Sequence, residues 1–178
     1  MQDVVNNNGP FTLDRETGKL SLNPYSWNNK ANVLFVDQPR GVGYSTAKAV
    51  IQNGEQVAED FHSFLGDFLD KFPQFKGRDL YITGQSYAGH YVPAISKLIH
   101  ERGDLDINFL GVAIGNGAFD KRYEQIKLPD FTYASGLIDE AAYKDYKQLQ
   151  EYCVQLIKEG NYQDAENDAC WIAFGKYI

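Results

Sequence analysis

Apolar residues between Glu55 and Phe72 recur at steps of three and four positions, the spacing of one face of an amphipathic helix. They are Val57, Ala58, Phe61, Phe64, Leu65, Phe68, Leu69 and Phe72. Pro73 follows directly and predicts the end of the helix. Because such a stripe is typical of core packing, we assign it no chemistry.

Short apolar runs predict strands between helical segments. Asp79–Thr83 predicts a buried strand, the spacing after it predicts a helix that reaches about Arg102, and Phe109–Ile114 predicts another strand. The continuous run Val33–Val36 predicts a central parallel strand that is covered on both faces. This alternation of strands and helices is typical of an α/β domain built on a parallel sheet.

The two ends of the chain have different patterns. Phe11–Leu22 predicts a hairpin, with a turn at Arg15–Gly18. From Ala118 onward the sequence is charged and helical, and no further strand is predicted. We therefore expect an α/β core over residues 1–117 and a helical region over residues 118–178.

An eight-residue segment that begins at Gly84, Gly-Gln-Ser-Tyr-Ala-Gly-His-Tyr, joins the predicted strand to the helix. A strand, a sharp turn through a serine and a helix are the context that displays a nucleophilic serine. The neighbours Gly84, Ala88 and Gly89 are small, as such a turn requires. Ser86 would then be the nucleophile, and the backbone N–H of Tyr87 would face a developing oxyanion. An ordinary helix N-cap is the alternative for Ser86.

Four further motifs flank this turn in a recognisable order. They are Asn8-Gly-Pro-Phe11, Asn23-Pro-Tyr-Ser-Trp27, the stretch from Ala31 to Ser45, and Ile114-Gly-Asn-Gly117. Together they resemble the serine carboxypeptidase family of α/β-hydrolases, from about residue 7 to about residue 136. The resemblance implies an α/β-hydrolase-like parallel sheet with flanking helices, followed by the start of a helical cap insertion. It also implies an acyl-enzyme on Ser86 that releases C-terminal amino acids from peptides.

Two positions depart from the family pattern. The family usually has a glutamate before the serine, paired with a glutamate of a Glu-Asn-Gly-Pro stretch, and this pair helps to bind the terminal carboxylate of a peptide. Gln85 and Asn7 stand at the matching positions. Amides pair without sharing a proton and always donate hydrogen bonds to a carboxylate. We expect substrate binding by Gln85 and Asn7 without the family's acid preference; a tolerated substitution and a turn residue are the alternatives.

The chain contains three histidines, and none fits the catalytic base, which follows the serine and the acid in α/β-hydrolases. His62 lies on the amphipathic helix, where we expect a surface or interface position. His90 lies just inside the helix after the turn, where the family has a structural residue, and His100 falls near its end, in solvent. The resemblance places the acid and base beyond Ile178 and other oxyanion donors before Met1, so we expect this chain alone to be inactive.

Composition and charge exclude several classes of binding partner. The net charge of −7 and the lack of a basic run argue against nucleic acid, no apolar stretch is long enough for a membrane span, and no metal or nucleotide motif is present. The resemblance implies peptide or protein C-termini as the partners, without a cofactor, and the oligomeric state is not indicated. Family members enter the secretory pathway and reach the lysosome, the vacuole or the extracellular space. Residues 1–8 lack a signal-peptide pattern, so we expect the natural start upstream.

The two cysteines, Cys153 and Cys170, match no zinc or redox spacing. A local disulfide, two free thiols and pairing with cysteines outside the chain are the alternatives, and the resemblance favours the disulfide. Acyl transfer to an alcohol and a non-catalytic binding module remain alternatives to the carboxypeptidase.

Overall fold

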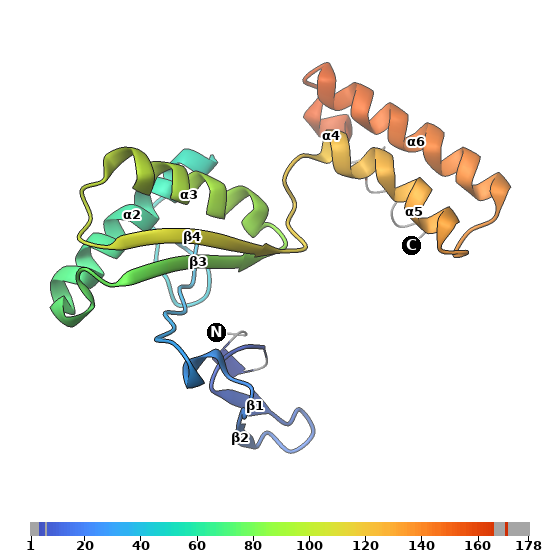
Figure 1. Ribbon diagram of the computed structural model, residues 1–178. Helices are drawn as coiled ribbons and strands as arrows, with labels where there is room; N and C mark the ends of the chain where they lie inside the picture. Colours follow the sequence, from blue (N-terminus) through green and yellow to red (C-terminus); the bar gives the residue numbers. More distant parts are fainter. Residues whose placement is uncertain (1–3, 6, 166–169, 171–178) are drawn as a thin grey trace. The chain divides into compact units, whose positions relative to one another are not determined.

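The computed structural model describes residues 4–5, 7–165 and 170 (Figure 1). The chain forms two compact units. The first contains residues up to 82 together with residues 93–112, and the second contains residues 83–92 together with residues from 113 onward. The serine turn falls in the second unit. The division expected between residues 117 and 118 stays a prediction.

An antiparallel hairpin stands near the start of the first unit, as predicted. Strand β1 spans Phe11–Leu13 and pairs with β2, which spans Leu20–Leu22. The Asp14 carboxylate accepts hydrogen bonds from two backbone N–H groups of the turn, at 2.9 and 3.0 Å. Gly18 adopts a left-handed φ of +68°, which a glycine tolerates well. A 3₁₀ helix, η1 (Trp27–Asn29), follows the hairpin.

Helix α2 spans Gly54–Lys71 and confirms the amphipathic pattern. It begins where the Asn53 side chain accepts a hydrogen bond from the N–H of Gln56, at 2.9 Å, which is an N-cap. It ends before a short 3₁₀ helix, η2 (Pro73–Phe75), because proline cannot continue the α-helical bonding. The buried residues of α2 are Val57, Ala58, His62, Leu65 and Leu69.

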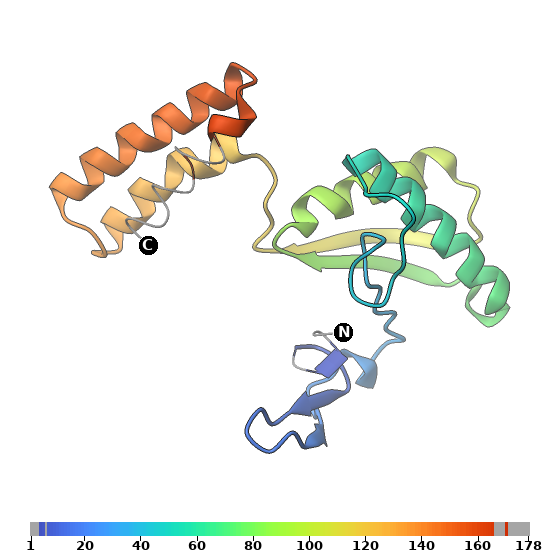
Figure 2. The same ribbon diagram turned by 180° about the vertical axis from the view of Figure 1, so that it is seen from behind.

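Strand β3 (Asp79–Gln85), helix α3 (Ala88–Arg102) and strand β4 (Asn108–Gly115) follow one another, as expected for a βαβ unit. The two strands are hydrogen-bonded neighbours and run parallel (Figure 1). Helices α2 and α3 lie on the same side of this strand pair in both views (Figures 1 and 2). The fold is therefore mixed α/β with a parallel sheet, as predicted.

Two predictions about strand burial and pairing are wrong. Val33–Val36 forms no strand, because no other strand of the described residues lies beside it to complete a ladder. Alternate residues of β3 and β4 are exposed, so one face of this pair is open rather than covered. Large side chains on this face include Tyr81, Leu110 and Val112.

The second unit continues after β4 as helices. They are α4 (Lys121–Glu124), the 3₁₀ helix η3 (Gln125–Lys127), α5 (Leu128–Ala134), α6 (Glu140–Lys158) and α7 (Tyr162–Asp164). Within the described residues no strand follows β4, as predicted. None of the helices in this described part is both long and apolar enough to cross a bilayer.

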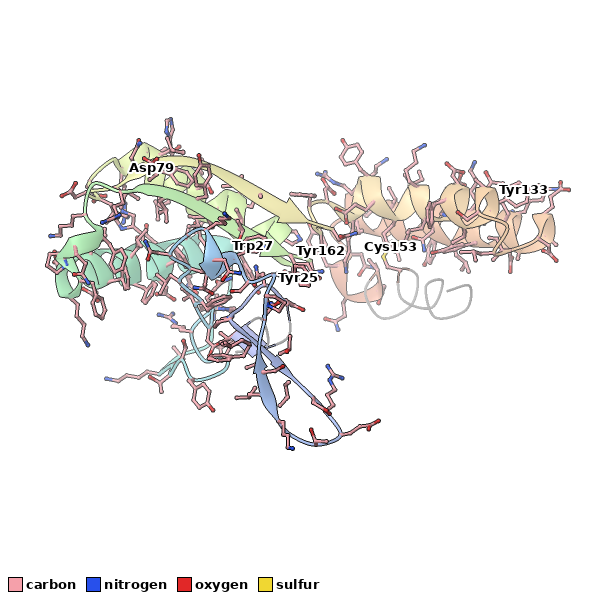
Figure 3. The ribbon with its side chains drawn as sticks, turned by 60° about the horizontal axis from the view of Figure 1, so that its bottom comes forward. Tyr25, Trp27, Asp79, Tyr133, Cys153 and Tyr162 are labelled. Atoms are coloured by element: carbon pink, nitrogen blue, oxygen red, sulfur yellow. A yellow bond between two sulfur atoms is a disulfide. The ribbon has the colours of Figure 1, made fainter. Side chains whose placement is uncertain are left out.

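Figure 3 shows Cys153 on α6. Its sulfur is bonded to that of Cys170, and both cysteines are buried with Leu156 and Ala165. The local disulfide is therefore the pairing that the structure contains, and the two alternatives are excluded in it.

Candidate active site

Ser86 occupies the sharp turn between strand and helix. Strand β3 ends at Gln85 and helix α3 begins at Ala88, so only Ser86 and Tyr87 lie between them. Ser86 has a φ of +59°, in the left-handed region that residues with a Cβ rarely adopt. Its side chain is exposed. The turn therefore exposes Ser86 between the carboxyl end of β3 and the amino end of α3.

Small residues make this turn possible. A Cβ on Gly84 would collide with the Cβ of Ala88. A Cβ on Gly89 would lie 2.7 Å from the backbone nitrogen of Ala118, closer than real Cβ contacts. Small residues are thus required for two reasons. Gly84 avoids a clash within the turn, and Gly89 avoids a clash with the loop that leaves β4.

The segment that leaves β4 holds the backbone of Ser86 on both sides. The N–H of Ser86 donates to the carbonyl of Gly115 at 3.1 Å, and the N–H of Ala118 donates to the carbonyl of Ser86 at 2.8 Å. Asn116, between these contacts, has a φ of +46°. The sequence motif Ile114-Gly-Asn-Gly117, to which no role was assigned, is the segment that makes these contacts. The motif itself was the signal, because its two glycines indicate a close approach of the backbone.

The backbone N–H of Tyr87 is available for an acceptor. Among the described residues it donates to no carbonyl, whereas the N–H groups two and three residues further on, at Gly89 and His90, donate to the carbonyls of Ser86 and Tyr87. The ring of Tyr87 packs against those of His90 and Tyr91, with centroids 4.6 and 5.0 Å apart. Burial, followed by the nearby Tyr87, raises the pKa of the Tyr91 hydroxyl. Tyr91 is therefore neutral and does not compete as a base.

Charged residues follow the exit loop of β4. Arg122 forms a two-pronged ion pair with Asp120 and also donates its backbone N–H to that carboxylate. These hydrogen bonds from Arg122 hold the pKa of Asp120 below its ordinary value, and the nearby His90 adds a smaller effect. Asp120 thus stays ionised and cannot act as a neutral acid near the turn.

The three histidines are not paired with Ser86. Across the described residues no hydrogen bond joins the Ser86 hydroxyl to any of them. His90 and His100 are exposed on α3, as expected. His62 is buried rather than at the surface, because its ring nitrogens contact Asp104 and Arg102.

The two amides expected to bind substrate are both exposed. Gln85 is the last residue of β3 and belongs to the second unit. Asn7 belongs to the first unit, where its carbonyl accepts a hydrogen bond from the Asn23 side chain at 3.4 Å. Their pairing stays a prediction.

This chain is similar to proteins of a known family. The sequence profile of the serine carboxypeptidase family matches residues 1–173. Serine carboxypeptidase-like 26 of Arabidopsis thaliana is 38% identical over 148 residues, which are 81% of this chain and 33% of that protein. Serine carboxypeptidase S10 family member 1 of Dictyostelium discoideum is 42% identical over 160 residues, which are 87% of this chain and 38% of that protein.

Among solved structures, Kex1(delta)p of Saccharomyces cerevisiae, a prohormone-processing carboxypeptidase, matches 100% of this chain and 41% of its own, with a TM-score of 0.85 and 28% identity. This chain thus spans between a third and about two fifths of the length of these proteins. The sequence profile covers nearly all of the chain, and the resemblance noted from its motifs is confirmed. The chain belongs to the serine carboxypeptidase family.

Proposed function

We propose that Ser86 is the nucleophile of a serine carboxypeptidase that releases C-terminal amino acids from peptides. The observation that carries this proposal is the left-handed, exposed Ser86 between β3 and α3. Backbone conformations of this kind persist where the surrounding structure over-determines them, and they cluster at active sites. An ordinary N-cap residue has extended φ and ψ angles, unlike Ser86.

The chemistry follows from a hydroxyl in that position. The Ser86 oxygen bonds to the carbonyl carbon of the last peptide bond while a base takes its proton. The carbonyl oxygen becomes an oxyanion, to which the N–H of Tyr87 donates. The C–N bond then breaks, the amine leaves with the proton, and water hydrolyses the ester on Ser86.

The base and its acid partner come from outside these 178 residues. All three histidines of the chain are described, and none is hydrogen-bonded to Ser86. Loss of the general base lowers a rate by roughly a hundred- to ten-thousandfold. We therefore expect the 178-residue chain alone to be inactive, and the full-length protein that contains it to be active.

Gln85 and Asn7 are the proposed contacts to the terminal carboxylate of the substrate. Both are exposed amides, and each donates N–H groups at every pH at which the protein is folded. We expect peptide affinity of the full-length protein to change little between about pH 5 and pH 7. Gln85→Glu should introduce a loss of affinity as pH rises, because a second carboxylate repels the first. A steep natural pH dependence that Gln85→Glu leaves unchanged would contradict this assignment.

The secretory pathway, with the lysosome, the vacuole or the extracellular space as destination, is the proposed location. The Cys153–Cys170 disulfide supports it, because disulfides form and persist in oxidising compartments.

The test uses a fluorophosphonate, which reacts with an activated serine. The full-length protein should be labelled at Ser86, and Ser86→Ala should abolish labelling and amino-acid release, whereas Ser63→Ala, an exposed serine on α2, should change neither. Absence of label at Ser86 would overturn the enzymatic proposal. Ester formation from an added alcohol, without amino-acid release, would identify an acyltransferase instead.

A further inference from the structure

Two residues with a Cβ have left-handed φ angles in the described part of the chain, and they are structural neighbours. They are Ser86, at +59°, and Asn116, at +46°. Ser86 begins the exit turn of β3. Asn116 lies in the exit turn of the adjacent strand β4, directly after Gly115, whose carbonyl accepts the Ser86 N–H. Both conformations are unfavourable by themselves for a residue with a side chain. Their adjacency points to two turns that hold each other.

We propose that the turn Gly115–Ala118 is a positioning element that fixes the orientation of Ser86, and that Gly89 is the residue that lets this turn approach. The proposal rests on the proposed function, because it assigns a task at the same serine. None of these residues touches a substrate in the proposal; each acts through residue 86.

The hydrogen bonds explain how the turn could fix a side chain that it does not touch. The turn bonds to the N–H and to the carbonyl of Ser86, at 3.1 and 2.8 Å, so the peptide groups on both sides of its Cα are held. With both peptide planes fixed, the direction of the Cα–Cβ bond is fixed as well. The Ser86 oxygen then retains only the rotation about that bond.

The turn is itself anchored by helix α4. The Glu124 carboxylate accepts hydrogen bonds from the N–H groups of Phe119 and Asp120, at 2.5 and 3.2 Å. These two residues directly follow Ala118, whose N–H holds the Ser86 carbonyl. A continuous set of hydrogen bonds therefore leads from α4 to the serine turn.

Two glycines in this region offer a matched pair of substitutions. A Cβ on Gly89 would lie 2.7 Å from both the nitrogen and the carbonyl carbon of Ala118, and backbone atoms cannot rotate away as a side chain can. Gly89→Ala must therefore push the Ala118 N–H away from Ser86. A Cβ on Gly115 meets nothing within 4 Å, and the φ of Gly115 is not left-handed. Gly115→Ala therefore adds the same methyl group without displacing the turn.

The test measures the position of residue 86 without requiring catalysis. In the full-length protein, Ser86→Cys introduces a thiol at this position, and mass spectrometry of the peptide that carries residue 86 follows its alkylation. Cys153 and Cys170 are joined in the disulfide and do not compete. A thiol in this turn, at the amino end of helix α3, should ionise below the pKa of about 8.5 of a free cysteine. The rate of alkylation by iodoacetamide, followed from pH 5 to pH 10, reports this ionisation together with the accessibility of the thiol.

In the Ser86→Cys background, Gly89→Ala should raise the midpoint of that pH profile toward about 8.5 and slow alkylation at pH 7 by about threefold or more. Gly115→Ala should change neither the midpoint nor the alkylation rate at pH 7 by more than the experimental error. Equal profiles for the two variants would overturn the proposal. If Gly89→Ala fails to fold, as judged by far-UV circular dichroism, Asn116→Val and Asn116→Gly replace the pair. Valine is disfavoured at a left-handed φ whereas glycine is not, so only Asn116→Val should shift the profile.

This outcome is separable from the proposed function. A Ser86 that is labelled in the full-length enzyme, together with equal thiol profiles, would leave the carboxypeptidase intact and remove the positioning turn. An unlabelled Ser86 together with different thiol profiles would remove the carboxypeptidase proposal and leave the positioning turn intact.

Discussion

Nε2 of His62 lies 2.8 Å from Oδ1 of Asp104, and this contact ties helix α2 to the segment that follows helix α3. A guanidinium nitrogen of Arg102 lies 3.4 Å from Nδ1 of the same ring, and Arg102 also pairs with Glu59 at 2.6 Å. Because an arginine only donates hydrogen bonds, Nδ1 is the acceptor and the N–H at Nε2 donates to Asp104. His62, which is 7% exposed, thus links two elements of the first unit.

Replacement of this linker by an apolar residue of similar size should destabilise the protein. His62→Leu removes two hydrogen bonds to charged partners, and we expect the free energy of unfolding to fall by about 1–3 kcal/mol. The measurement is urea denaturation at neutral pH. His100→Leu is the matched control, because His100 is exposed near the end of α3. Equal stabilities of the two variants would show that the contacts of His62 contribute nothing.

The disulfide closes a loop of 17 residues around the end of α6. A cross-link over such a loop stabilises the folded state by about 3 kcal/mol, mainly by restricting the unfolded chain. The double substitution Cys153→Ala with Cys170→Ala should therefore lower amide hydrogen-exchange protection in the second half of α6. Protection in α2, which belongs to the other unit, should not change.

A reducing agent provides the control for this prediction. It should bring the natural protein to the exchange pattern of the double variant, and it should have no effect on the double variant. Unchanged protection of α6 after reduction would mean that the cluster of Cys153, Leu156, Ala165 and Cys170 holds by packing alone.

Local patterns predicted the parts of the fold that depend on nearby residues. The helix at Gly54–Lys71 and the β3–α3–β4 unit follow from apolar spacing, glycines and prolines within a few positions. Val33–Val36 has the composition of a strand, but a strand needs a partner ladder, which its own sequence does not supply. The burial of His62 likewise depends on Asp104, 42 residues away.

The candidate site likewise contains residues that the local sequence predicts and contacts that it does not predict. Ser86 and its small neighbours are consecutive in the sequence, so a local motif identified them. The contacts of Ser86 with Gly115 and Ala118 join residues about 30 positions apart, and no periodicity encodes them. Cysteine spacing left several pairings open for Cys153, because the geometry of the pair arises only when α6 and the following segment pack.

Tyr143 on α6 donates its hydroxyl to the carboxylate of Asp130 on α5, at 2.9 Å. This hydrogen bond, with smaller effects of Lys147 and Lys127, holds the pKa of Asp130 below its ordinary value of 3.8. A lowered pKa in the folded state means that the ionised carboxylate favours folding above about pH 4, and that this contribution is lost as pH falls through the lowered pKa. Tyr143→Phe should raise the pKa of Asp130 toward its ordinary value.

The measurement for this pair is an NMR titration of the Asp130 carboxyl carbon in both proteins. Tyr133→Phe is the matched control. The ring of Tyr133 stacks on that of Tyr143 with centroids 4.8 Å apart, and Figure 3 labels Tyr133 on the α5–α6 hairpin. This control removes a hydroxyl from the same pair of rings without removing the hydrogen bond to Asp130. The same Asp130 titration in the natural protein and in Tyr143→Phe would contradict the assigned cause.

Gln150 is completely buried on α6, at 0% exposure, and within the described residues neither its amide nitrogen nor its amide oxygen has a hydrogen-bond partner. A buried polar group without a partner costs about 1–3 kcal/mol, because it has given up its hydrogen bonds to water. Gln150→Met keeps the length of the side chain and removes both polar atoms. We expect the free energy of unfolding to rise by roughly this amount. Gln148→Met, at an exposed position of the same helix, should leave it unchanged within about 0.5 kcal/mol. A loss of stability in Gln150→Met, measured by urea denaturation, would instead reveal a polar partner for Gln150 in solution, such as a buried water.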